Sequence, residues 1–232
     1  MGSIALFLAE IASAMLSFIL ARFMAKPYLY TRDNRYIGLP FGFTFLGISY
    51  FFMGLTFYLS SFPFVEEVGW LELFTEAYAY AFFVVTYYFS GKELRRSTRL
   101  WWQFIFSGII VIVIATYFII LEPSSPIFTL PSFEVADRYI SGFDIICAVS
   151  ISVYTLRSHA LKPDPTTVWA PLGYLLLAFG EYSSLIWSLD SSSSALAGAY
   201  IIRLAGLVVF FFISYKAFFT PSTVATKNKG LE

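Results

Sequence analysis

Charged residues are scarce in this chain. They make up 13% of its 232 residues, whereas soluble domains carry about 25%. Apolar residues account for 58% of the chain and aromatic residues for 21%. This composition is not that of an ordinary soluble domain, and it indicates a protein that folds in a lipid bilayer.

Cysteine and histidine are each present once, as Cys147 and His159. A lone cysteine excludes an intramolecular disulfide. One cysteine and one histidine cannot supply a zinc site or a bis-histidine haem site. We therefore expect no metal centre and no cofactor.

The residue patterns of retinal proteins and of common membrane enzymes are also missing. No phosphate-binding glycine loop occurs. The last apolar run offers Arg203 where a retinal Schiff base needs lysine. Intramembrane aspartyl proteases need two aspartates at depth, and only Asp144 qualifies. The pair Glu66-Glu67 is predicted to lie in a loop with no arginine soon after it, unlike the paired glutamates of membrane peptidases. We expect that the protein is not an enzyme.

Long apolar runs, in contrast, are abundant. Each of seven runs of roughly 20 residues can cross a hydrocarbon layer about 30 Å thick at about 1.5 Å per residue. The runs cover residues 4–24, 37–62, 69–89, 100–121, 138–156, 168–189 and 196–218. They predict an all-α integral membrane protein with one transmembrane domain of seven helices.

Basic residues predict the orientation. If the helices alternate in direction, 13 of the 15 basic residues fall on one side of the membrane. They are Arg22, Lys26, Arg32, Arg35, Lys92, Arg95, Arg96, Arg99, Arg157, Lys162, Lys216, Lys227 and Lys229. The positive-inside rule makes this side cytoplasmic. We therefore predict a multi-pass protein of the cell membrane, with the N-terminus outside and the tail 219–232 in the cytoplasm.

The two halves of the chain resemble each other. The segment 40–43 (PFGF) is similar to 171–174 (PLGY), and at this offset residues 40–61 and 171–192 share five identities in 22 columns. Rare polar residues also meet when the halves are aligned: Glu10 with Asp144, Tyr50 with Glu181, and Glu76 with Arg203.

These matches predict an internal duplication with a 3+1+3 plan. Residues 1–90 form the first three-helix repeat, 100–121 a linker helix, and 138–218 the second repeat. Because four helices separate the copies, they point the same way across the membrane. The plan is similar to that of sugar-transporting SWEET proteins and of bacterial vitamin transporters, but their sequence motifs do not occur here.

Six ionisable residues lie inside predicted helices. They are Glu10, Glu72, Glu76, Asp144, Glu181 and Arg203. A charge at membrane depth costs several kcal/mol, so it is expected to face the bundle interior and to have a partner. We expect Arg203 to pair with Glu76 and Glu181. The remaining carboxylates must then be protonated, hydrated from outside, or neutralised by a bound cation.

The predicted ligand- or ion-binding residues are Glu10, Tyr50, Glu76, Asp144, Glu181 and Arg203. Alternatively, Arg203 only ties the two halves together, Tyr50 is a packing residue, and Glu72 simply reaches water near the interface. Acidic residues are also expected around the external ends of the helices, and they would concentrate cations over a binding site inside the membrane. This acidic rim consists of Glu66, Glu67, Glu122, Glu134, Asp137 and Asp190.

Three functions remain open from the sequence. The first is binding or transport of a small solute, cation or proton between the two repeats. The second is a seven-helix sensor that signals to a cytoplasmic partner, and the third is an accessory subunit of a membrane complex. The expected partners are the lipid bilayer, a small solute or cation, and a cytoplasmic protein or a second copy of the chain. No nucleic-acid partner is expected.

Overall fold

The computed structural model describes residues 2–31, 37–59, 65–90, 132–161 and 168–219. Throughout these ranges the fold is all-helical, and each helix is long and apolar enough to cross a membrane. The helices are α1 (Gly2–Thr31), α2 (Gly38–Tyr58), α3 (Val65–Ser90), α5 (Phe133–Leu161), α6 (Ala170–Asp190) and α7 (Ser193–Phe219). The chain is therefore a multi-pass membrane protein. The predicted helix 100–121 lies outside the described residues, as does the tail from residue 220 onward.

Helices α3 and α5 begin four and five residues earlier than their apolar runs suggested. Helix α5 starts at Phe133, whereas the predicted run covers 138–156. Helix α3 starts at Val65, which places Glu66 and Glu67 in its first turn rather than in a loop. Acidic side chains in a first turn interact favourably with the positive end of the helix dipole. Polar residues thus extend these helices beyond the stretch that hydropathy marks.

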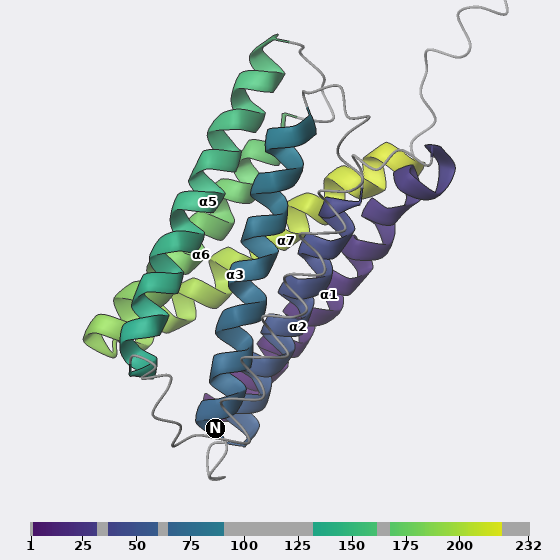
Figure 1. Cartoon of the computed structure of the whole chain (residues 1–232). Coiled ribbons are helices and arrows are strands. Elements are labelled where there is room, and N and C mark those ends of the chain that lie inside the picture. The colour runs from purple at the N-terminus through teal and green to yellow at the C-terminus, as the bar shows by residue number, and fades with distance from the viewer. Residues whose placement is uncertain (1, 32–36, 60–64, 91–131, 162–167, 220–232) are drawn as a thin grey trace, which may run out of the picture.

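The six helices form a closed ring. Each packs against the next in the order α1, α2, α3, α5, α6, α7, and α7 returns to α1. Figure 1 shows α1, α3, α5 and α7 running in one direction and α2 and α6 in the other. A ring of this kind has an interior that all six helices face.

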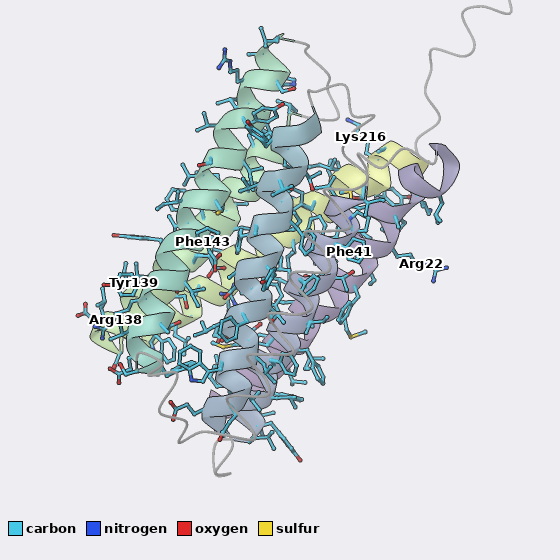
Figure 2. All side chains as sticks on the ribbon, viewed as in Figure 1. Arg22, Phe41, Arg138, Tyr139, Phe143 and Lys216 are labelled. Atoms are coloured by element: carbon cyan, nitrogen blue, oxygen red, sulfur yellow. The ribbon has the colours of Figure 1, made fainter. Side chains whose placement is uncertain are left out.

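Polarity in this ring is the reverse of that in a soluble protein. Large apolar side chains point outward, including Ile4, Ile146, Val153 and Ile201, each at least 60% exposed. Figure 2 shows Tyr139 and Phe143 projecting away from the bundle on α5. The interior holds the ionisable side chains, several of them fully buried. Lipid tails solvate the apolar exterior, and the helices satisfy their own backbone hydrogen bonds.

Four aromatic rings pack together in the middle of the bundle: Phe43 on α2, Phe83 on α3, Tyr174 on α6 and Phe210 on α7. Phe43 meets Phe83 at 4.9 Å between ring centroids, and Tyr174 meets Phe210 at 4.7 Å. Across the bundle, Phe43 meets Phe210 at 5.5 Å and Phe83 meets Tyr174 at 5.7 Å. All four contacts are edge-to-face, the arrangement that aromatic pairs prefer. We call these four residues the aromatic tetrad.

Two glycines make room for the aromatic tetrad. A Cβ on Gly42 would lie 2.4 Å from the Phe83 ring, and a Cβ on Gly173 would lie 2.7 Å from the Phe210 ring. Neither ring can easily move away, because each is buried against the other members of the tetrad. The close approach of α2 to α3 and of α6 to α7 therefore depends on glycine at both positions.

We predict that Gly42→Ala and Gly173→Ala each lower the free energy of unfolding by about 1–3 kcal/mol, the usual cost of overpacking a filled core. Gly142→Ala is the matched control, since nothing lies within 4 Å of its added Cβ. Alanine should leave stability unchanged there or raise it, because it is the better helix former. Thermal unfolding of the purified protein would measure the difference, and equal effects at the three glycines would contradict the packing described.

Candidate functional site

The six predicted binding residues come one from each described helix. Glu10 lies on α1, Tyr50 on α2, Glu76 on α3, Asp144 on α5, Glu181 on α6 and Arg203 on α7. All six are at most 4% exposed. The ring of helices therefore brings residues that are far apart in sequence to one buried level.

Arg203 is the centre of this group. Its Nη1 donates a hydrogen bond to Glu10 Oε1 at 3.2 Å. Its Nη2 lies 3.3 Å from both carboxylate oxygens of Glu181 and 3.8 Å from Glu76 Oε1. The guanidinium carbon also lies 4.8 Å from the centroid of the Tyr50 ring, which is a cation–π distance. One buried cation is thus shared by three acids and one aromatic ring.

The local sequence explains how α7 brings this guanidinium so close. Gly180 precedes Glu181 on α6, and a Cβ added to Gly180 would lie 3.2 Å from the Arg203 Cβ. The turn between the two helices is tight, with Ser191 in the left-handed region (φ 52°) and its N–H bonded to the Trp187 carbonyl. Ser183 Oγ also donates to the Ala195 carbonyl at 2.8 Å. This hairpin holds Glu181 and Arg203 in register.

Tyr80 adds a second polar contact to the same site. Its hydroxyl donates to Glu181 Oε1 at 3.2 Å, so Glu181 receives hydrogen bonds from both α3 and α7. Tyr80 lies one turn after Glu76 and is fully buried. Tyr80 is not among the predicted binding residues. Its spacing of four residues from Glu76 was the available signal.

Several acidic oxygens at this level have no hydrogen-bond partner among the described residues. Both oxygens of Asp144 are in this state, together with Glu76 Oε1 and Glu10 Oε2. Asp144 is fully buried and makes no ion pair with Arg203, although it lies within electrostatic range of Glu76, Glu181 and Arg203. Burying polar groups without partners is costly. The site therefore holds more acidic groups than its one guanidinium can satisfy.

A cavity of about 510 Å³ leads to this site from one end of the bundle. It lies where α2 and α6 end and where α3 and α5 begin. Exposed Glu66 and Glu134 line its outer part, whereas buried Glu76 and Arg203 line its inner part. Glu72 lines it as well and is 7% exposed.

The walls of the cavity combine acidic, hydroxyl and apolar groups. Asp137 on α5 is the fifth acidic residue that lines the cavity, and Ser141 and Ser184 add hydroxyl groups. Met53 and the aromatic rings of Phe57, Phe133 and Trp187 supply apolar surface. A volume of this size is within the range of small-molecule sites, about 300–1,000 Å³. The cavity can thus admit a small molecule as far as Arg203.

The sequence matches no protein-family model, and neither a curated protein nor a solved structure matches it significantly. Within the described part of the chain, no three histidine, cysteine or acidic side chains are placed to hold a metal ion. The function therefore has to be argued from the site itself.

The structure agrees in part with the expected pairing. Arg203 contacts Glu181 and Glu76 as expected, but its 3.2 Å contact with Glu10 was not foreseen. Asp144 and Tyr50 lie at the same buried level, Tyr50 beneath the guanidinium and Asp144 without a hydrogen bond. Of the predicted acidic rim, Glu66, Glu134 and Asp137 line the cavity, and Glu122 lies outside the described residues.

We predict that Glu10→Gln and Asp144→Asn differ in their effect on stability although both remove a buried carboxylate. Glu10→Gln should cost about 1–3 kcal/mol, because it removes a charge-assisted hydrogen bond to Arg203. Asp144→Asn should leave stability unchanged or raise it, since neither carboxylate oxygen has a bond to lose. Thermal unfolding in the same detergent compares the pair, and a larger loss for Asp144→Asn would contradict the network.

Proposed function

We propose that this protein is a seven-helix membrane protein that binds a small solute, cation or proton at the Arg203 site and carries it across the membrane. The observation that carries the proposal is the cavity. It connects one end of the bundle to a buried site in which acidic groups outnumber the guanidinium. Ionisable groups inside a membrane protein typically mark a substrate or proton pathway.

The arrangement of the helices supports the proposed duplication. Under the 3+1+3 plan, α1, α2 and α3 correspond to α5, α6 and α7. The neighbours α1–α2 and α2–α3 then correspond to α5–α6 and α6–α7, and α3–α5 corresponds to α7–α1. Every contact in the ring thus has a counterpart in the other half, as a two-fold axis along the membrane normal requires.

Matched side chains support the same axis. Gly42 packs on Phe83 as Gly173 packs on Phe210, at the offsets that align the two halves. The contact of Phe43 with Phe83 likewise corresponds to that of Tyr174 with Phe210, with interplanar angles of 64° and 65°. The proposed axis therefore passes through the aromatic tetrad.

The aromatic tetrad lies one layer away from the ionic site on all four helices. On α2 and α6, Phe43 and Tyr174 precede Tyr50 and Glu181 by seven residues. On α3 and α7, Phe83 and Phe210 follow Glu76 and Arg203 by seven residues. Seven residues are about two turns, or about 10 Å. The tetrad thus fills the bundle on the side of the site away from the cavity.

This layering suits a transporter with one side open and the other closed. A solute entering the cavity meets the Arg203 network first and cannot pass the buried rings behind it. Passage to the far side would require the halves to move apart at the tetrad while the cavity closes, as in rocking movements of repeats about a central site. The excess of acids supplies groups that can take up a proton or pair with a cation during such a cycle.

We predict that Arg203→Ala and Glu181→Gln abolish transport by the reconstituted protein. The assay would follow internal pH with a proton-sensitive dye in proteoliposomes, under a pH gradient and with a mixture of candidate solutes. Asp190→Asn is the matched control, because it removes an exposed carboxylate at the cavity end that does not line the cavity. Flux that is unchanged in both site variants would contradict the assignment of these residues.

The described basic residues support the proposed orientation. Figure 2 shows Arg22 and Lys216 toward one end of the bundle and Arg138 toward the other. Because α3 and α5 run in the same direction, the chain leaves α3 at the first end and enters α5 at the second. This path supports the proposed seventh membrane-crossing segment, and under the proposed orientation the cavity opens to the external side.

We predict that a membrane-impermeant maleimide added to intact cells labels Ser191→Cys and does not label Ser158→Cys. Both positions are exposed, and they lie at opposite ends of the bundle. The variants should be made in a Cys147→Ala background, so that each carries one thiol. Permeabilised cells give the total reactive thiol as the control, and labelling of Ser158→Cys from outside would reverse the orientation.

A further inference from the structure

The two matched helix interfaces carry opposite chemistry. At α1–α7, Arg203 donates to Glu10 across the interface. At α3–α5, the residues aligned with Arg203 and Glu10 are Glu76 and Asp144. One interface therefore contains its own cationic group, whereas the other brings two acids together.

Glu76 and Asp144 have carboxylate oxygens that accept no hydrogen bond within the described part of the chain. Glu76 Oε1 and both Asp144 oxygens make no hydrogen bond to any described residue, and both side chains are at least 96% buried. Glu72 lies one turn before Glu76 on the same face, and the two carboxyl groups interact. The α3–α5 interface thus concentrates acceptors, and the described cation nearest to them is Arg203 of α7, whose Nη2 lies 3.8 Å from Glu76 Oε1 without a hydrogen bond.

The cavity lies at this same interface. Glu72 and Glu76 line it from α3, and Asp137 and Ser141 line it from α5. Glu76, whose Oε1 has no hydrogen bond to the described residues, is at the inner part of the cavity. A ligand that enters from the cavity mouth therefore passes other acids before it reaches Glu76.

The lining restricts the chemistry of that ligand. Five acidic side chains line the cavity against one guanidinium, which disfavours an anion. No three acidic side chains in the described ranges are placed to hold a bare metal ion. An ammonium or guanidinium group needs no such coordination shell and hydrogen-bonds to carboxylates. Trp187, Phe57 and Met53 offer apolar surface for the rest of the molecule, and the rings can also attract the cation.

We propose that the cavity binds a small organic cation, with its ammonium or guanidinium group against Glu76 at the position that Arg203 occupies in the matched interface. The apolar part of the ligand packs against Trp187 and Phe57. This inference rests on the proposed function and specifies its substrate class.

The test uses three probes of nearly the same shape, which are benzylammonium, benzyl alcohol and benzoate. Their binding to the purified full-length protein in lipid nanodiscs is measured by isothermal titration calorimetry, with empty nanodiscs as the blank. Benzylammonium should bind at least about tenfold more tightly than benzyl alcohol, and benzoate should bind more weakly still.

Two variants test whether benzylammonium binds in the cavity. Glu76→Gln should weaken benzylammonium binding by at least about tenfold, since a buried charge partner is lost. Trp187→Leu should weaken binding severalfold while keeping the preference for the cation, which also covers the case that Glu76→Gln fails to fold. Asp190→Asn, the carboxylate control outside the cavity, should bind benzylammonium within about twofold of the unaltered protein.

Tighter binding of benzoate than of benzylammonium, lost in Arg203→Gln, would overturn the cation assignment and leave the proposed solute site in place. Equal or absent binding of the three probes would also overturn it, and so would benzylammonium binding that is insensitive to both cavity variants. The proposed function is tested independently, by the loss of flux in Arg203→Ala and Glu181→Gln.

Discussion

The structure depends on a single guanidinium kept out of water. Arg203 lies 3.2 Å from Glu10, 3.3 Å from Glu181 and 3.8 Å from Glu76, so one cation connects α7 with α1, α6 and α3. In a membrane interior such a charge is tolerated only when its partners are held in place. The contact between α1 and α7 closes the ring of helices, and the ion pair lies across that contact. Fold and site therefore depend on the same interaction.

The side chains in the bundle interior differ on the two sides of this network. On one side the cavity carries acidic and hydroxyl groups to the exposed end of the bundle. On the other side the rings of the aromatic tetrad fill the bundle in edge-to-face contact at 4.7–5.7 Å, and the hydroxyl of Tyr174 donates to that of Tyr87. The cavity opens at one end of the bundle, and the aromatic tetrad closes the bundle toward the other end. The two faces of the membrane therefore differ in their access to the site. The proposed directional movement would require such a difference, and so would sensing.

Much of the fold could be predicted because the bilayer restricts the choice of structure. Only helices satisfy their backbone in hydrocarbon without a partner strand, so long apolar runs identify the spans. A rare charge at membrane depth must face inward, which is why Glu10, Glu76 and Arg203 could be assigned to one site. The sequence could not show which acid Arg203 prefers, because the contact with Glu10 depends on the packing of α7 against α1. It also could not show the cavity, whose walls come from the ends of four helices, or the early start of α5 at Phe133.

The opposite charges at matched positions have a consequence for how such a protein could arise. Under the proposed duplication, Glu76 and Arg203 descend from one ancestral position. Two identical copies of the first half would place Glu76 against Glu76, and two copies of the second half would place Arg203 against Arg203 as well as against Asp144. Neither symmetric assembly could form the present network. Under the proposed duplication, a single polypeptide would keep the two diverged halves together, so that one Arg203 always meets Glu10, Glu76 and Glu181.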